Sequence, residues 1–265
     1  MGYISIIFYG QARMKDRLPF NLRTPLVLWS GFLCIFSLIG SIVVLPEFYR
    51  TYKNHGFIAT FCSDSFRHEK HVFYWYTYFT LSKVLELIDT LFIVLRKQKL
   101  IQLHWVHHAL TMCFTFFTAS NPPGTTRYMV GMNFAIHTIM YGYYCLTAMR
   151  IRIPRIISIM ITGGQIAQMI MGLYIHSYVL MSIIFGFDSC DCSTRHCIAG
   201  FLVYALYFYY FVSFFIEKYV TGSGRHKQTA KQMDKPMIDT GSTPEHTTNK
   251  IIDLNNNNGL RMKSE

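Results

Sequence analysis

The chain of 265 residues is 51% hydrophobic and only 15% charged, which excludes an ordinary soluble domain and indicates a membrane protein. Its formal net charge of +11 favours an anionic partner, either anionic lipid at the membrane surface or an anionic substrate.

Six apolar stretches are long enough to cross a membrane, since a crossing helix needs about 20 mainly apolar residues. The amino-terminal sequence MGYISIIFY is apolar but too short to cross, so we interpret it as an interfacial segment or a truncated first helix. We therefore predict an all-α polytopic membrane protein with six full transmembrane helices and a truncated first helix. The predicted spans are 26–45, 72–95, 105–120, 128–148, 156–186 (long, or broken) and 198–220.

Basic residues are denser on one side of these spans, where RMKDRLPFNLR, RKQK and MRIRIPR lie together with the carboxy-terminal tail. That side is expected in the cytosol, although FYRTYKNHG and SFRHEKH make the bias imperfect. The tail is rich in Gly, Ser, Thr and Asn without a hydrophobic period, which predicts flexibility. The predicted organisation is a partial first helix with a cytosolic basic segment (1–25), a six-helix transmembrane domain (26–221) and a flexible cytosolic tail (222–265).

Four of the seven cysteines lie in predicted loops on the non-cytosolic side, where an oxidising compartment allows disulfides. The spacing of CDCSTRHC fits no common zinc-ligand pattern, so a disulfide is favoured over a metal site. A bridge from Cys62 to Cys190, Cys192 or Cys197 would join two distant loops, and the pattern by itself does not choose among the three.

The second predicted span contains KVLELIDT, whose polar residues are expensive in hydrocarbon. On a helix, Lys83 and Glu86 are three residues apart and Glu86 and Thr90 are four apart, so they share one stripe near Asp89. An internal ion pair that holds helices together explains this stripe as well as a functional site does.

The next three spans also carry polar stripes at helical spacing. A single polar residue in a span is usually a helix–helix hydrogen bond, but four consecutive spans with such stripes favour one shared internal site. The stripes are formed by His104, His107 and His108, by Asn133, His137, Tyr141 and Tyr144, and by Thr162, Gln165 and Gln168.

Clustered histidines first suggest a metal, because membrane di-iron desaturases and hydroxylases carry similar HxxHH boxes. Those enzymes need several boxes, and the remaining histidines of this chain form no second one. A zinc site that adds His137 would have only Glu86 and Asp89 as orienting carboxylates. We therefore predict metal-free chemistry with imidazole as nucleophile and general base. A metal-dependent membrane desaturase or hydroxylase and a transporter or channel are the alternatives.

Four ordered motifs carry a resemblance to a known family. KVLELIDT, HWVHH, HTIMYGYY and TGGQIAQ match KxxExxDT, HxxHH, HxxMYxYY and TxxQxxQ of the very-long-chain fatty-acid elongase (ELO) family. The resemblance runs from about RLPFNLRTPLVLWS to the end of the sixth span. The Trp of LHWVHH, with PLVLWS and LRKQKLI, is most similar to the subgroup that elongates saturated and monounsaturated acyl groups of palmitate type.

The resemblance implies an enzyme of the endoplasmic reticulum membrane that condenses a long-chain acyl-CoA with malonyl-CoA. The products would be a 3-oxoacyl-CoA two carbons longer, carbon dioxide and CoA. Its helices are expected to enclose an acyl tunnel that CoA enters from the cytosol, and no cofactor or metal is expected. The expected partners are the ketoacyl reductase, dehydratase and enoyl reductase of the elongation cycle; a homo-oligomer is compatible, and no nucleic acid is expected.

The same resemblance implies roles for single residues. His107 is expected to attack the thioester and form an acyl-imidazole, with His137 as its polarising or proton-accepting partner. Asn133 and Tyr141 would donate to developing oxyanions, and Lys83 would hold the active face together or contact the malonyl carboxylate. The remaining expected site residues are His104 and His108, which are catalytic, and Glu86, Asp89, Thr90, Tyr144, Gln165, Gln168, Arg96, Lys97 and Lys99, which bind substrate or support the site.

Three further expectations depend on the resemblance. The basic segments RKQK and MRIRIPR are expected to hold the phosphates of CoA by charge-assisted hydrogen bonds. Cys190 becomes the expected partner of Cys62. Near the carboxy terminus, Arg261 and Lys263 resemble the family's dibasic endoplasmic reticulum retrieval signal, which implies a cytosolic carboxy terminus.

Overall fold

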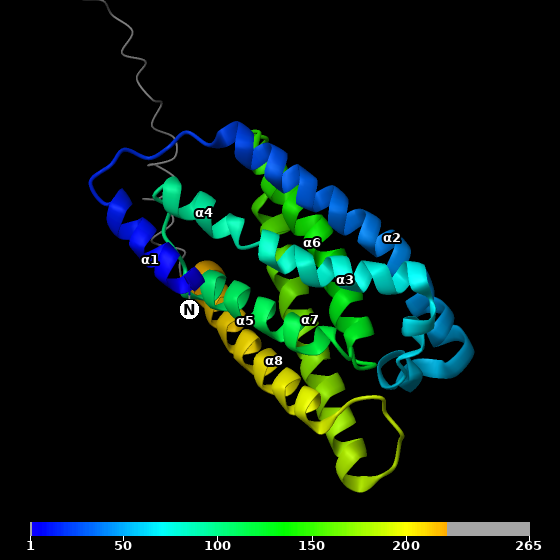
Figure 1. Cartoon of the computed structure of the whole chain (residues 1–265). Helices are drawn as coiled ribbons and strands as arrows, with labels where there is room; N and C mark the ends of the chain where they lie inside the picture. The colour runs from blue at the N-terminus through cyan, green and yellow to red at the C-terminus, as the bar shows by residue number, and fades with distance from the viewer. Residues whose placement is uncertain (1, 222–265) are drawn as a thin grey trace, which may run out of the picture. The chain divides into compact units, whose positions relative to one another are not determined.

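The computed structural model describes residues 2–221, and it contains helices and no strand within that range. The predicted tail 222–265, with Arg261 and Lys263, lies outside the described residues. Figure 1 shows the elements, which are α1 (Gly2–Met14), α2 (Arg23–Cys62), the 3₁₀ helix η1 (Ser65–His68), α3 (Lys70–Leu85), α4 (Ile88–Leu95), α5 (Gln102–Ala119), α6 (Thr126–Ala148), α7 (Arg155–Phe185), α8 (Thr194–Phe215) and the π-helix η2 (Ile216–Thr221).

Long apolar helices make this an all-α polytopic membrane protein. Among the described residues, α2, α7 and the segment Thr194–Thr221 are long and apolar enough to cross a membrane. Many of their large apolar side chains are exposed, as expected for helices that lipid covers. α7 is continuous over 31 residues, which answers whether the predicted span 156–186 is long or broken. The predicted number of six spans stays a prediction.

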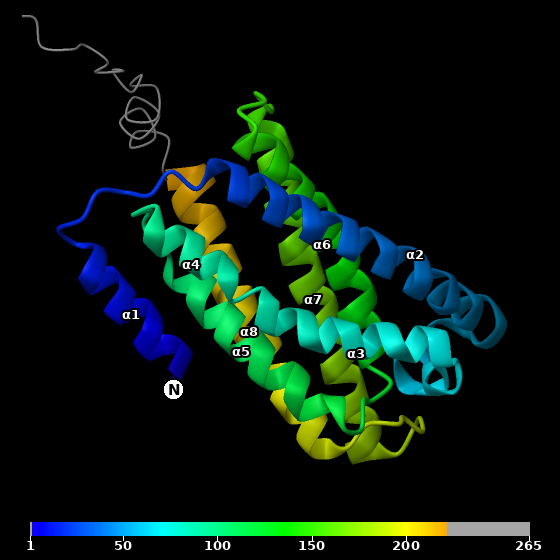
Figure 2. The same cartoon turned by 45° about the horizontal axis from the view of Figure 1, so that its top comes forward.

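The main helix pairs join both distant and consecutive parts of the chain. In both views α2 lies along α6, α7 lies beside α8, and α5 crosses close to α8 (Figures 1 and 2). The short helix α1 packs against α4 and α5. Among the helices that carry the predicted motifs, α3 packs on α5 and α6 packs on α7.

The helix α2 extends well beyond the carboxy-terminal end of the predicted span 26–45. The helix continues through Pro46 and kinks at Gly56, where φ is 82°. Proline removes one backbone donor, but it does not end a helix whose next turn is held by other contacts. Here Glu47 accepts a hydrogen bond from Arg127 Nε at 3.0 Å, and both side chains are buried.

The predicted span 72–95 consists of two helices, so the prediction of one continuous helix was wrong. α3 and α4 are separated by a tight turn at Glu86 and Leu87, in which the amides of Asp89 and Thr90 donate to carbonyls three residues earlier. Such 3₁₀ bonding changes the side-chain directions relative to an unbroken α-helix. Glu86 and Thr90 therefore take different partners, although an α-helix would place them on one stripe.

Arg127 holds together the end of the bundle where α2, η1 and α6 meet. Its fully buried guanidinium donates to the Glu47 carboxylate, to the carbonyls of Thr60 (2.9 Å) and Ser63 (2.8 Å), and to the hydroxyl of Ser65 (2.8 Å). A buried charge is tolerated when a counter-ion and hydrogen bonds satisfy it. Removing one partner of this pair would leave the other charge buried without compensation.

A disulfide joins the same end of the bundle covalently. It links Cys62, the last residue of α2, to Cys190 in the connection between α7 and α8, which is the pairing that the resemblance implies. The amide of Asp191 donates to the Cys62 carbonyl at 2.7 Å, and the amide of Gly124 donates to the Asp191 carbonyl at 2.9 Å. The bridge and these bonds hold three connections of the chain together.

Two glycines allow α7 and α8 to approach closely. A β-carbon on Gly172 would overlap the ring of Tyr204, and one on Gly200 would overlap the ring of His176. The His176 ring packs on Tyr204 with centroids 5.2 Å apart, and its Nδ1 donates to the Gly172 carbonyl at 2.8 Å. Each helix thus places a ring over the glycine of the other, as small residues permit in membrane helix pairs.

The substitution Gly200→Ala is expected to destabilise the protein by about 1–3 kcal/mol, because the new methyl group must displace the buried His176 ring. The matched control is Gly163→Ala in α7, where a β-carbon meets nothing within 4 Å and helix propensity favours alanine. Thermal unfolding in detergent micelles measures both variants. Equal unfolding temperatures for the two would contradict the assigned contact.

Candidate active site

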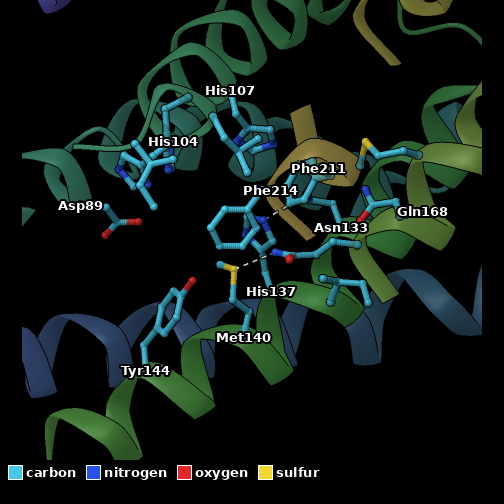
Figure 3. Close-up of a pocket in the computed structure, with 16 residues that line it drawn as sticks. Asp89, His104, His107, Asn133, His137, Met140, Tyr144, Gln168, Phe211 and Phe214 are labelled. Carbon is cyan, nitrogen blue, oxygen red and sulfur yellow. Dashed lines mark hydrogen bonds between the residues drawn. The ribbon is translucent and has the colours of Figure 1, made fainter. Parts of the chain in front are cut away.

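An internal cavity of about 160 Å³ lies among α4, α5, α6, α7 and α8. Figure 3 shows His104 and His107 on one side of it and Asn133, His137 and Met140 on another. Side chains from all four predicted motifs line this one space from four helices, α4 to α7, and α8 adds aromatic side chains. The lining includes Asp89, His104, His107, His108, Asn133, His137, Met140, Tyr144, Gln165, Gln168, Phe211 and Phe214.

The three histidines of α5 form a packed group at the cavity wall. The ring centroids of His104 and His108 are 4.4 Å apart, and those of His107 and His108 are 5.5 Å apart. His107 packs against Tyr207 at 4.8 Å and edge-on against Phe211 at 5.9 Å. Within residues 2–221 no side chain forms a hydrogen bond with either ring nitrogen of His107, so the unprotonated nitrogen is open to a ligand in the cavity.

A buried polar network stands behind the cavity wall. Lys83 Nζ donates to Glu86 Oε1 at 2.6 Å and to Asn133 Oδ1 at 2.9 Å. The Asn133 amide is thereby oriented, and its Nδ2 donates to His137 Nε2 at 3.2 Å. Because Nε2 accepts, the neutral ring of His137 carries its proton on Nδ1. This nitrogen lies 3.7 Å from Glu86 Oε1, so the network selects one tautomer of His137.

The side chain of Lys83 lies outside the cavity lining. Lys83 is buried and also lies over the Phe79 ring at 4.2 Å, and neither Lys83 nor Glu86 is among the residues that line the cavity. The pair thus connects the end of α3 to α6, and the two expected roles of Lys83 stay predictions. Asn133 lines the cavity and connects this pair to His137.

Asp89 is held by two donors from other helices. Trp29 Nε1 donates to Oδ1 at 2.7 Å, and the Tyr141 hydroxyl donates to Oδ2 at 2.7 Å. Tyr141 was expected to donate to a developing oxyanion. In the structure its hydroxyl proton is donated to Asp89. Sequence reasoning missed Trp29 as a site residue. The signal for it was indirect, because an indole N–H inside a bundle needs an acceptor.

The remaining predicted residues line the cavity or support its walls. Thr90 is fully buried, and its hydroxyl lies 3.1 Å from His104 Nε2. Gln165 Nε2 donates to the sulfur of Met140 at 3.2 Å, and the buried Gln168 lines the cavity. Sequence reasoning also missed Phe211 and Phe214, because the aromatic run of α8 resembles any membrane-facing stretch.

Sequence comparison decides the family. The sequence model described as ELO: GNS1/SUR4 family matches residues 1–227. The chain belongs to this family. It is similar to the very long chain fatty acid elongase 6 of Drosophila melanogaster, with 35% identity over 93% of this chain and 79% of the relative. The long chain fatty acid elongase 1 of Caenorhabditis elegans is 36% identical over 86% of this chain and 79% of the relative, and the very long chain fatty acid elongase 3 of Homo sapiens is 37% identical over 82% and 80%.

Family membership decides between the alternatives that the sequence left open. A metal-dependent desaturase or hydroxylase and a transporter both drop out, because an ELO-family protein is a fatty acid elongase.

In the basic segment RKQK of this ELO protein, Lys97 binds backbone carbonyls, whereas Lys99 is exposed. Lys97 has a positive φ of 52°, and its Nζ donates to the carbonyls of Lys15 (2.8 Å) and Arg17 (3.1 Å). Lys97 thus fastens the connection between α1 and α2. Arg96 is half-buried and Lys99 is exposed, so Lys99 is the more accessible cation for an incoming anion.

The substitution Lys83→Met is expected to destabilise the ELO protein by about 3–5 kcal/mol, because it leaves the Glu86 charge buried without a partner. The double variant Lys83→Met with Glu86→Gln should recover most of that loss. The control is Arg50→Met, which breaks the exposed Arg50–Glu69 pair and should cost less than about 1 kcal/mol. Unfolding midpoints in micelles measure all three, and a loss for Lys83→Met no larger than the control would contradict the assignment.

Proposed function

We propose that this ELO-family protein catalyses the condensing step of fatty-acid elongation through an acyl-histidine intermediate on His107. Family membership makes the chain an acyltransferase of the 3-oxoacyl-CoA synthase type. The observation that supports the intermediate is geometric. His107 lines the internal cavity together with His137, and its ring nitrogens have no hydrogen-bond partner among residues 2–221.

In the first half-reaction, a ring nitrogen of His107 attacks the thioester carbon of acyl-CoA. The carbon–nitrogen bond forms, the carbon–sulfur bond breaks, and the imidazole proton goes to the departing thiolate of CoA. In the second half-reaction, malonyl-CoA loses carbon dioxide, and the electron pair left on its α-carbon attacks the acyl carbon. The carbon–nitrogen bond then breaks, the imidazole takes up a proton, and 3-oxoacyl-CoA is released.

His137 is the proposed partner of His107. Charge develops on the thioester oxygen in the first half-reaction and on the malonyl thioester oxygen in the second, and donors fixed in advance stabilise such charge best. The Lys83–Asn133 link fixes the tautomer of His137 before substrate binds. His104 and His108 form the wall that orients the His107 ring.

The proposed reaction needs no metal or redox cofactor. Thioester attack, decarboxylation and carbon–carbon bond formation all move electron pairs, and no atom has to exchange electrons with a cofactor. Tyr207 and Phe211 pack against His107 and cover part of its ring, which would shield an acyl-imidazole from hydrolysis. We further propose that acyl-CoA and malonyl-CoA are the two substrates.

The proposed location is the endoplasmic reticulum membrane with a cytosolic carboxy terminus. Apolar helices support membrane insertion, and the denser basic residues beside RKQK and MRIRIPR support the orientation. The proposed partners are the ketoacyl reductase, dehydratase and enoyl reductase, because a 3-oxoacyl thioester needs those three steps before the next condensation.

The substitution His107→Ala is expected to lower the condensation rate by about 10³-fold or more, because it removes the proposed nucleophile. The assay follows 3-oxoacyl-CoA formation by purified protein, and acid quenching with labelled acyl-CoA alone measures the acyl-enzyme. The control is His55→Ala, an exposed histidine outside the cavity, which should keep both signals. Label retained by the His107→Ala protein would contradict the proposed intermediate.

The substitution Lys99→Gln is expected to raise the KM for both CoA substrates by about threefold with little change in kcat, because an exposed cation contributes modestly and is screened by salt. The salt dependence of KM should weaken in the variant. The matched control is Lys53→Gln in α2, an exposed lysine distant in sequence from the basic segments. A KM that stays at the wild-type value across the salt range would rule out a role of Lys99 in CoA binding.

A further inference from the structure

The amino-terminal helix α1 brings one side chain to the edge of the active site. The Tyr3 hydroxyl lies 2.7 Å from Thr90 Oγ1, and Thr90 Oγ1 lies 3.1 Å from His104 Nε2. α1 is held at this place by packing on α4 and α5, where Phe8 contacts Trp105 edge-on with ring centroids 5.8 Å apart. A continuous polar link therefore runs from α1 to the first histidine of the cavity.

The chemistry of the three groups allows their protons to be arranged in one consistent order. Each hydroxyl has one proton to donate and lone pairs that accept. If Thr90 donates to His104 Nε2, its oxygen accepts the proton of Tyr3, and the neutral imidazole carries its own proton on Nδ1. Both hydroxyls and His104 Nε2 are then paired, and the Thr90 hydroxyl is fully buried, where an unpaired polar group would be costly. Without the Tyr3 donor, the Thr90 hydroxyl has less to hold it in this rotamer.

We propose that Tyr3 is a positioning residue for the condensation reaction: through Thr90 it fixes the tautomer and the ring orientation of His104. The inference rests on the proposed function, since it assigns Tyr3 a part in that reaction. His104 packs on His108, which packs on His107, so the orientation of His104 bears on the reacting ring. None of the four motifs includes Tyr3, which lies 87 residues before Thr90.

The substitution that tests the proposal is Tyr3→Phe, which removes one oxygen and keeps the ring. One neutral hydrogen bond corresponds to a change of about 3- to 10-fold, so kcat should fall by that factor. The KM values for acyl-CoA and malonyl-CoA should stay within about twofold, because Tyr3 and Thr90 do not line the cavity. The matched control is Tyr9→Phe on the same helix, whose exposed hydroxyl has no hydrogen-bond partner among the described residues and which should keep the wild-type kcat.

A double-mutant cycle separates positioning through Thr90 from a structural effect of α1. Thr90→Val breaks the link at its centre, so adding Tyr3→Phe to it should cause no further loss of kcat. Thr90→Ser keeps the hydroxyl, and Tyr3→Phe should lower kcat in that background as it does in the wild type. Losses that multiply in the Thr90→Val background would overturn the proposal, because Tyr3 would then act by docking α1.

The same measurements distinguish a failure of the proposed function from a failure of the proposed role of Tyr3. Purified wild-type protein that makes no 3-oxoacyl-CoA from acyl-CoA and malonyl-CoA would contradict the proposed function itself. An active wild type with an unchanged kcat in Tyr3→Phe would leave the proposed function in place and overturn the role of Tyr3. Thermal unfolding of each variant is recorded in parallel, and a kcat loss matched by an equal loss of folded protein would also count against positioning.

Discussion

The active site depends on the buried ammonium of Lys83. An ion in an apolar bundle is costly unless partners satisfy it, and Lys83 has one partner beside the end of its own helix and another on α6. Because Glu86 and Asn133 must both reach this nitrogen, α3 and α6 pack in one register. That register turns Asn133 towards His137, and it places Tyr141, one turn further along α6, beside Asp89. The arrangement of the catalytic face follows from satisfying one charge.

A second buried ion pair stabilises the part of the bundle that carries the disulfide. Arg127 on α6 binds Glu47 on α2, while the bridge between Cys62 and Cys190 joins the end of α2 to the connection before α8. α2 and α6 are thus joined directly at this pair and, through Trp29, Asp89 and Tyr141, again at the site. Two separate attachments resist rotation of α2 against α6, the helix that contributes Asn133 and His137 to the cavity wall.

Fixed partners and free groups have different functions in this site. His137 and His104 each accept or share a hydrogen bond that determines where their protons lie, and His107 has open ring nitrogens in the described part of the chain. A nucleophile must be free to form a bond, whereas a group that stabilises charge works best when it is already oriented. The ring of His107 is oriented by packing against the rings of His108 and Tyr207, and not by hydrogen bonds to its own nitrogens within the described residues.

The sequence by itself determined that this is a helical membrane protein with its chemistry on four polar motifs, because hydropathy and helical spacing are local properties. It did not show that α2 continues past Pro46 or that the second predicted span breaks at Glu86, since distant contacts decide both. Tertiary structure alone brought Trp29 and Tyr141 to Asp89, from positions 60 and 52 residues away. No local periodicity encodes such separations, so only the packing of helices against one another could decide which donors the buried carboxylate would have.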